Sequence, residues 1–575
     1  MHVVATAGHV DHGKSTLVRA LTGTEPDRWA EERRRGMTID LGYAHTALPS
    51  GEVLALVDVP GHARFIGNML AGLGPAPAVL LVVAADEGWR RQSAEHLAAV
   101  EALGLRHGLL CVTRSDLADP APAVAEALDH LRGSSLGECE AVTVSGTTGA
   151  GLPDLVAALD RLVAQLPAPD TAAPVRLWVD RAFTVRGTGT VVTGTLGAGT
   201  LRTGDALLLG DREVRVRGLQ ALGSPAEEVP AVARVAVALR GVERDDVVRG
   251  DALLAPGAWR ATDVLDVRTS ATGEHLVLHA GTAAVPVRLR PLGDGTARLL
   301  LARPLPLRAG DRALLRDPAA QVVASGVEVL DADPPPLRRR GAARARAEVL
   351  SAGPLTAADE VARRGAVRRE ELDRLGVDSS GLPDVAGWLV DPGRAAAWRA
   401  DLRRRVEEHD RDAPLDRGLP LEAARRAAGL PDRAVLVALA AQEGLVVDAG
   451  RVRSTADPGL GVAEDAVRRL EERLAVDPFA APERGELDTL GLGARELAAA
   501  AAAGRVLRLT GDVVLLPDGP ARAMRLLAAL PQPFTLSAAR QALATTRRVA
   551  VPLLEHLDTR GWTRRVDAAT RVVVR

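Results

Sequence analysis

The sequence ATAGHVDHGKS fills residues 5–15 and decides the fold of the first part of the chain. It follows a short apolar segment, residues 2–6, and precedes a helical pattern at residues 15–21. A Gly-x4-Gly-Lys-Ser pattern between a strand and a helix is typical of a phosphate-binding loop, because its glycines let backbone N–H groups turn toward phosphate oxygens. Lys14 would reach the β- and γ-phosphates, and the Ser15 hydroxyl would bind Mg2+.

A second observation points to Lys14 independently. It is the only lysine among the 72 basic residues of the chain, and all the others are arginine. A compact ammonium between phosphates is hard to replace with a planar guanidinium. We therefore predict that Lys14 is functional.

The next strand also ends in polar residues. An apolar segment at residues 53–57 runs into Asp58-Val59-Pro60-Gly61. A carboxylate beside the phosphate loop can hold Mg2+ through water. The Gly61 N–H can reach a terminal phosphate, so that this loop would sense whether the phosphate is present.

Further apolar segments at 79–84, 108–112 and 141–144 alternate with helical patterns. This alternation predicts a parallel, doubly wound α/β sheet with ligand loops at the carboxyl ends of its strands. Asp116 follows the segment at 108–112 and can accept hydrogen bonds from N1 and N2 of guanine. We expect GTP to be preferred over ATP.

Four segments carry a resemblance to a known family: TAGHVDHGKS at 6–15, RGMTIDLGY at 35–43, DVPGH at 58–62 and NMLAG at 68–72. In this order they resemble the translational GTPases of the elongation factor Tu type, and within them the bacterial selenocysteine-specific elongation factors. The resemblance implies GTP hydrolysis to GDP, stimulated by the ribosome, with Mg2+ as the metal.

The resemblance also assigns site residues. It makes His62 the catalytic residue that positions the attacking water, and Thr38 a ligand of Mg2+ and the γ-phosphate. Arg114 stands where the family has lysine, and its stem and flat head can pack over the base in the same way. The nucleotide would be bound by Asp11, His12, Gly13, Lys14, Ser15, Thr16, Gly61, Thr113, Arg114, Asp116, Ser145 and Gly146. Mg2+ would be held by Ser15, Thr38 and, through water, Asp58.

From residue 175 to about residue 330 the sequence consists of short β-branched runs separated by glycine turns. This pattern predicts two small β-barrels that meet near Trp259. In the family that the chain resembles, the first barrel helps to form the aminoacyl pocket, which here would contain Asp180, Arg181 and Arg234. A selenol is largely ionised at neutral pH whereas a serine hydroxyl is not, so a cationic pocket would discriminate by charge.

After a proline-rich basic linker the pattern becomes helical and repeats. Gly444, Gly504 and Gly561 each end an amphipathic helix and precede two short strands, at spacings of 60 and 57 residues. A shorter helix precedes each of these helices. Helix, turn, helix, glycine and hairpin in this order predict winged helices, with a further copy at 341–395.

Only the last copy is basic. Residues 518–575 contain ten arginines and four acidic residues, a balance of +6 in a chain whose net charge is −2. Winged helices also serve as protein-contact modules, but the resemblance implies that this copy binds an mRNA hairpin. The expected contacts are Arg547, Arg548, Arg560, Arg564 and Arg565, with Arg548 facing outward.

The predicted fold class is therefore multidomain: an α/β P-loop GTPase domain, two β-barrels and tandem winged-helix domains. The predicted domains are 1–170 (GTPase), 174–260 and 261–335 (barrels), and winged helices at 341–395, 396–457, 458–517 and 518–575. The longest uninterrupted apolar run is too short to cross a bilayer, and the N-terminus does not resemble a signal peptide. We expect a monomeric, cytoplasmic protein without membrane contact.

The predicted function is delivery of selenocysteinyl-tRNA to the ribosome at recoded UGA codons, with the C-terminal winged helix on the mRNA selenocysteine-insertion hairpin. Two alternatives stay open. One is a general carrier of elongator or initiator tRNA, which would not explain the winged helices. The other is a nucleic-acid-binding regulator that uses GTP as a conformational ligand.

Overall fold

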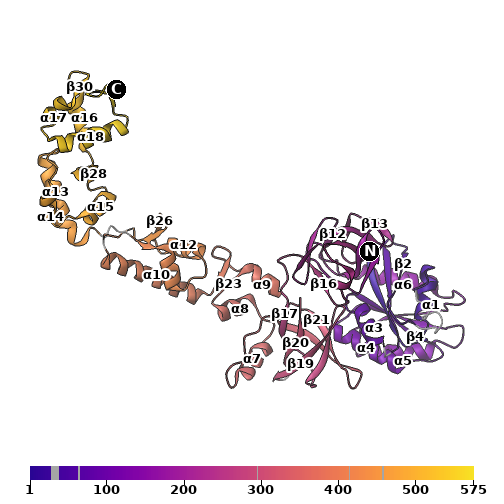
Figure 1. Ribbon diagram of the computed structural model, residues 1–575. Coiled ribbons are helices and arrows are strands. Elements are labelled where there is room, and N and C mark those ends of the chain that lie inside the picture. Colours follow the sequence, from indigo (N-terminus) through magenta and orange to yellow (C-terminus); the bar gives the residue numbers. More distant parts are fainter. Residues whose placement is uncertain are drawn as a thin grey trace. The chain divides into compact units, whose positions relative to one another are not determined.

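The structure, a computed structural model of the chain, describes residues 1–26, 38–62, 65–293, 295–413, 415–416, 418–455 and 459–574. Residues 35–37 of the second motif segment lie outside these ranges, as does the boundary predicted at 457 and 458. Two compact units are present: residues 1–363 with 367–382, and residues 364–366 with 383–575. The predicted α/β domain, barrels and winged helices are confirmed (Figure 1).

A six-stranded sheet forms the core of the N-terminal domain. Its strands are β1 (His2–Gly8), β2 (Gly42–Ala47), β3 (Val53–Asp58), β4 (Ala78–Ala84), β5 (Gly108–Thr113) and β6 (Glu140–Thr143). They lie in the order β2-β3-β1-β4-β5-β6, and only β2 and β3 are antiparallel. The strand order reverses at β1: β3 and β2 lie on one side of it, and β4, β5 and β6 lie on the other. Such a switch point opens a crevice at the carboxyl ends of the strands, where the phosphate-binding loop begins.

Helices cover both faces of this sheet. One face packs against α3 (Ile66–Leu73), α4 (Arg91–Leu103) and α5 (Ala121–Arg132), and the other against α1 (Lys14–Thr22) and α6 (Leu152–Ala164). Side chains of β1 alternate between the two cores: Val3 and Ala5 join the first, and Val4 joins the second. Because both faces are covered, all seven residues of β4 are buried, which explains its uninterrupted apolar sequence.

Two closed barrels follow. The first contains β7 (Arg176–Trp178), β8 (Arg181–Val185), β9 (Gly189–Leu196), β11 (Ala206–Leu209), β12 (Arg212–Ala221), β13 (Ser224–Ala226), β15 (Ala233–Arg240) and β16 (Ala252–Leu254), with β10 (Thr200–Arg202) and β14 (Glu228–Pro230) as a separate pair. The second contains β17 (Thr262–Arg268), β18 (His275–Ala280), β19 (Ala283–Gly293), β20 (Thr296–Leu305), β21 (Arg312–Asp317) and β22 (Val322–Asp331).

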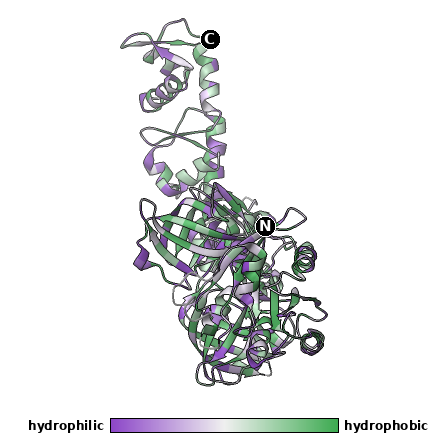
Figure 2. Cartoon of the chain, turned by 90° about the vertical axis from the view of Figure 1, so that its right-hand side faces the viewer, coloured by the Kyte–Doolittle hydropathy of each residue, from purple (hydrophilic) through white to green (hydrophobic). Residues whose placement is uncertain are grey.

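Alternation of side chains explains why these segments close into barrels. Along β19, buried and exposed residues alternate from Ala283 to Arg290, so that valine and leucine fill the interior. The hydropathy colouring in Figure 2 shows the apolar strands of the sheet and barrels in green. Trp259 lies between the two barrels, in the connection from β16 to β17.

A buried network of four charged side chains joins the second barrel to α7 (Ala342–Ser351). Asp266 on β17 is fully buried and accepts hydrogen bonds from Arg298 Nε and Arg346 Nε, both at 2.7 Å. Arg346 also pairs with Asp331. Two guanidiniums therefore face two carboxylates, and each buried charge has a partner.

The C-terminal elements confirm the winged-helix repeat. The first copy has α8 (Ala357–Arg364), β23 (Ala366–Arg368), α9 (Arg369–Leu375) and β24 (Trp388–Val390), and the second has α10 (Pro392–Asp412), β25 (Leu419–Pro420), α11 (Leu421–Ala428), α12 (Arg433–Gln442), β26 (Val446–Asp448) and β27 (Arg451–Arg453). The third has α13 (Glu464–Val476), α14 (Arg484–Thr489), α15 (Ala494–Ala502), β28 (Leu507–Leu509) and β29 (Val513–Leu515). The fourth has α16 (Gly519–Ala528), β30 (Phe534–Thr535), α17 (Leu536–Ala542), α18 (Arg547–Thr559), β31 (Thr563–Arg565) and β32 (Thr570–Val573).

The repeated glycines have the same backbone conformation. Gly444, Gly504 and Gly561 follow the second helix of their copies with φ angles of 70°, 70° and 72°, a region that favours glycine. The predicted boundary between residues 395 and 396 needs correction, because it falls inside the continuous helix α10. No helix among the described residues has the length and apolar character needed to cross a membrane.

We predict that Asp266→Ala destabilises the chain by about 3–5 kcal/mol, because it leaves two buried guanidiniums without a shared carboxylate. Urea unfolding of the full chain, followed by hydrogen exchange of amides in β17, measures the effect. Glu228→Ala is the matched control, because Glu228 pairs with Arg202 at the surface and its loss should cost less than about 1 kcal/mol. Equal effects of the two substitutions would contradict a stabilising role for the network.

Candidate functional site

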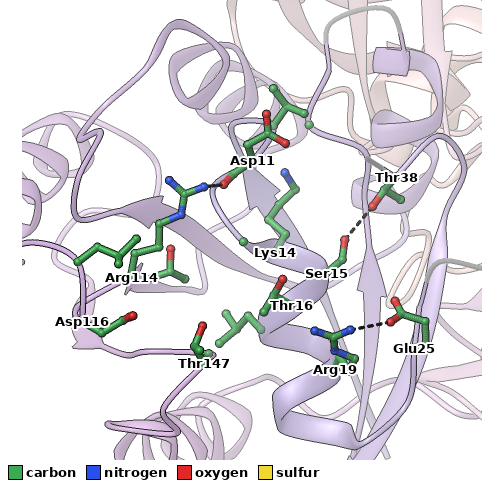
Figure 3. A pocket seen from close by; sticks show the side chains of 17 residues that line it. Asp11, Lys14, Ser15, Thr16, Arg19, Glu25, Thr38, Arg114, Asp116 and Thr147 are labelled. Carbon is green, nitrogen blue, oxygen red and sulfur yellow. Dashed lines mark hydrogen bonds and ion pairs between the residues drawn. The ribbon is translucent and has the colours of Figure 1, made fainter. Parts of the chain in front are cut away.

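A cavity of about 700 Å³ lies at the carboxyl ends of β1 and β5 (Figure 3). It brings together predicted nucleotide-binding residues from four separate parts of the domain. Those that line it are Asp11, Gly13, Lys14, Ser15, Thr16, Thr38, Gly61, Thr113, Arg114, Asp116 and Gly146. His12, Asp58 and Ser145 are buried beneath its wall, and His62 is not among the lining residues.

Hydrogen bonds from Lys14 to the loop backbone, and close packing of Gly8, hold the phosphate-binding loop in place. Lys14 Nζ donates hydrogen bonds to the carbonyl oxygens of Gly8, at 3.0 Å, and His9, at 2.7 Å. Gly8 has a φ of 138°, and a Cβ atom there would lie 2.2 Å from the Val82 carbonyl oxygen. The loop therefore packs backbone to backbone against β4, with the ammonium of Lys14 fixed above it.

Three oxygen-bearing side chains converge next to Lys14. Ser15 Oγ lies 2.8 Å from Thr38 Oγ1 and donates to Asp58 Oδ2 at 2.7 Å. The other oxygen of Asp58 accepts from Thr6 Oγ1 at 2.8 Å. Burial raises the pKa of the Asp58 carboxyl, so a nearby cation would stabilise its ionised form. Hydroxyl and carboxylate oxygens are the ligands that Mg2+ prefers, and this donor set fits the ion.

The predicted guanine loop is tied to the phosphate-binding loop. Thr113 Oγ1 donates to the His12 carbonyl oxygen at 2.7 Å. The guanidinium of Arg114 forms ion pairs with Asp86, at 2.9 Å, and Glu87, at 3.0 Å, and donates to the Asp11 carbonyl. These partners hold its head group at the rim, while its stem lines the cavity. Lysine has no planar fork and could not make the same set of contacts.

Gly61 contacts the phosphate-binding loop so closely that no other residue fits. A Cβ atom on Gly61 would lie 2.5 Å from Val10 N and 2.6 Å from Lys14 Nζ. The next residue, His62, points its ring toward Phe65, with the ring centroids 6.0 Å apart. The catalytic role of His62 therefore stays a prediction.

Sequence reasoning missed two residues of α4 that support the loop. His96 Nδ1 accepts a hydrogen bond from the Gly8 N–H at 3.0 Å, and Gln92 Oε1 accepts from the Val10 N–H at 2.9 Å. Burial lowers the pKa of His96 to about 3, so its ring is neutral at physiological pH. The one sequence signal that could have indicated them is their spacing of four residues, which places both side chains on the same face of the helix.

The residues of the predicted aminoacyl pocket come together around Tyr43. Arg181 and Arg234 lie over its ring, at 5.0 and 3.9 Å from the centroid, and line a cavity of about 320 Å³. Arg234 pairs with buried Asp180, and Arg181 pairs with Asp40 at 3.0 Å. Each guanidinium therefore has a carboxylate beside it, and the pocket is less cationic than the sequence suggested.

The C-terminal arginines differ in their surroundings. Arg547, Arg560, Arg564 and Arg565 are exposed, and the structure gives none of them a carboxylate partner within the described part of the chain. Arg548 is exposed as well, but its Nη2 donates to the carbonyl oxygens of Ala481 and Pro482, because that segment packs against the core beneath α18.

Comparison with known proteins identifies the domains. The model described as Elongation factor Tu GTP binding domain matches residues 1–165, and Elongation factor Tu domain 2 matches 189–254. Elongation factor Tu 2 of Streptomyces avermitilis is 36% identical over 282 residues, which cover 44% of this chain and 72% of that protein. The chain belongs to the elongation factor Tu family of translational GTPases.

Within this family, the predicted resemblance to selenocysteine-specific elongation factors is confirmed. Their β-barrel domain model matches residues 270–336, and the model described as Elongation factor SelB, winged helix, matches 525–572. The selenocysteine-specific elongation factor of Escherichia coli is 40% identical over 352 residues, 59% of this chain and 56% of that protein. That of Desulfomicrobium baculatum is 39% identical over 349 residues, 56% of this chain and 55% of that protein. The chain thus matches little more than half the length of these relatives.

A solved structure extends the similarity to the whole chain. The crystal structure of a bacterial selenocysteine-specific elongation factor superimposes with a TM-score of 0.79 and 26% identity, covering all of both chains. The order of GTPase domain, barrels and winged helices is therefore shared with this family member.

We predict that Gly61→Ala weakens GDP and GTP binding by at least about tenfold, roughly 1.4 kcal/mol, because its methyl group would displace Lys14 and the loop backbone. Isothermal titration calorimetry measures the change. Gly67→Ala is the matched control, since a Cβ atom on Gly67 meets open space. Unchanged affinity in Gly61→Ala would show that the loops separate when nucleotide binds.

We also predict an acid-sensitive contribution from His96. The unfolded chain protonates this ring near pH 6.5 and the folded chain only near pH 3, so the stability it contributes is complete above pH 6.5 and is lost as the pH falls toward 3. His96→Gln keeps an acceptor for Gly8 but does not titrate. Between pH 7 and pH 5 the free energy of unfolding should therefore fall by about 2 kcal/mol less in His96→Gln than in the unchanged chain, as measured by urea titration. Parallel pH profiles for both proteins would refute a buried neutral His96.

Proposed function

We propose that this chain is a GTP-dependent, selenocysteine-specific elongation factor. It would carry selenocysteinyl-tRNA to the ribosome at recoded UGA codons, hydrolyse GTP there and leave as the GDP form. It would act as a monomer in the cytoplasm. The relatives named above support this proposal, and the cavities of the GTPase domain and first barrel supply the chemistry.

The nucleotide would occupy the large cavity after β1. Lys14 would bind the β- and γ-phosphates, Asp116 would accept from guanine, and Ser15, Thr38 and Asp58 would hold Mg2+. The bound Mg2+ would neutralise charge on the phosphates. Gly61 lies against the loop, and its backbone N–H would report the terminal phosphate. His62, one residue further on, would orient the attacking water.

Recognition of the aminoacyl group would depend on Arg181. This observation carries the proposal: Arg181 Nε is buried in the wall of the Tyr43 cavity and has no hydrogen-bond partner among the described residues. A buried guanidinium donor without an acceptor is unfavourable, and a selenolate would supply the acceptor. A neutral seryl hydroxyl would supply a weaker one.

The fourth winged helix would bind the mRNA hairpin through exposed arginines at its second helix and wing. Arg547, Arg560, Arg564 and Arg565 would contact phosphates or base edges, and Arg548 would do so through the guanidinium nitrogens that Ala481 and Pro482 do not occupy. Affinity would fall with salt, because such arginines displace counterions from the RNA.

We predict that Arg181→Met lowers the preference for selenocysteinyl-tRNA over seryl-tRNA by at least about tenfold, because only the former presents an anion to the guanidinium. Filter binding with both aminoacyl groups on one tRNA body measures the ratio. Arg202→Met, at an exposed ion pair of the same barrel, should leave the ratio unchanged. If Arg181→Met weakened both tRNAs equally, this arginine would serve only to connect the barrel to Asp40.

A further inference from the structure

A second polar cavity lies where the GTPase domain and the two barrels meet. It has a volume of about 340 Å³ and shares no residue with the nucleotide cavity or the Tyr43 cavity. Leu103 at the end of α4 forms one wall, Arg176 and Trp178 on β7 form another, and Arg308 and Arg312 come from the second barrel. The predicted functions of the chain do not use this cavity.

The cavity carries excess positive charge. Arg176 is neutralised by Asp311, which accepts from its two terminal nitrogens at 2.6 and 2.8 Å. Arg308 and Arg312 form no ion pair with a carboxylate within the described ranges. Three guanidiniums and one carboxylate therefore line the space, a formal charge of +2, and Asp311 and Asp170 act on the Arg308 guanidinium only through space.

Arg308 is partly buried in the wall of the cavity. Burial lowers the pKa of its guanidinium, the charge of Asp311 opposes this shift, and the charge of Arg176 lowers the pKa further. Its head group lies 4.6 Å from the ring centroid of Trp259, and Arg176 lies 4.4 Å from the same ring. Cation–π contacts stabilise an unpaired guanidinium only in part, so an anion in the cavity would add a favourable interaction.

The aromatic walls are fixed, so the cavity is preformed. Trp259 Nε1 donates to the Val175 carbonyl oxygen at 2.9 Å. Trp178 packs directly on Gly281, where a Cβ atom would lie 2.4 Å from the indole ring. Rigid walls reduce the entropic cost of binding, and the volume is at the lower end of the range for small-ligand sites, roughly 300–1,000 Å³.

We propose that this junction cavity binds a small phosphate-bearing anion of about the size of a diphosphate, with Arg308 and Arg312 as its charge partners. Guanidiniums match phosphate oxygens in geometry as well as charge. Because the walls come from three domains of one compact unit, the bound anion would stabilise their packing. The proposal does not depend on the identity of the aminoacyl group that the chain carries.

Inorganic pyrophosphate is the probe for this site. The full chain is first saturated with GDP, so that the nucleotide cavity is closed to the probe, and is then titrated calorimetrically. We expect saturable binding of one pyrophosphate, weakened at least about tenfold in Arg308→Met and partly restored in Arg308→Lys. Arg312→Gln should weaken binding as well, and Arg202→Gln should not.

Two outcomes would overturn the proposal. One is the absence of saturable binding to the GDP-saturated chain, and the other is equal pyrophosphate affinity in the unchanged chain and Arg308→Met. GDP affinity and thermal unfolding of the variants serve as controls for folding. Competition by sulfate with the same dependence on Arg308 would leave the site in place but widen its ligand class to small divalent anions.

Discussion

Backbone-to-backbone contact around the phosphate-binding loop is the constraint on which the nucleotide site depends. Gly8 at the end of β1 lies against the Val82 carbonyl of β4, and Gly61, just beyond β3, lies against Val10 and Lys14. Neither contact leaves room for a side chain. The strand order β3-β1-β4 therefore fixes both the loop that would hold phosphates and the loop that would respond to them. Side chains of α4 complete the arrangement by accepting the loop N–H groups.

Much of this site could be predicted from the sequence, because its parts lie directly after apolar strands. Asp58 ends such a strand, Lys14 and Asp116 follow one within a few residues, and parallel strands bring their carboxyl ends to one edge. The fold class followed from equally local signals: strand and helix alternation, glycine turns and the spacing of Gly444 and Gly504. Local patterns were sufficient to predict the fold wherever the order of strands and helices allows only one way of packing them.

Contacts between distant segments could not be predicted in this way. The ion pairs of Arg114 with Asp86 and Glu87 depend on how two loops approach, and no spacing in the sequence reports it. Arg548 is exposed, yet one of its nitrogens donates to carbonyls of the preceding copy, a contact that the pattern of the helix does not report. In a chain with a single lysine, arginine counts alone say little about nucleic-acid binding. The partner of each arginine decides its role.

Many of those partners lie in another domain. Arg176 reaches Asp311 from one barrel to the other, Arg249 reaches Asn68 in the GTPase domain, and Arg260 reaches Glu371 in α9. A planar guanidinium can donate to two acceptors at once, which suits contacts that must fix both distance and orientation.

The buried network around Asp266 decides where the chain can be divided into modules. A piece ending in the proline-rich linker, at residue 335, would lose Arg346, so that buried Asp331 would lose this ion pair and Asp266 would keep only Arg298. The linker is thus an internal loop of a folding unit rather than a border between units. Recombination or truncation that respects this chemistry must keep α7 with the barrel, and the compact unit that contains both continues to residue 382.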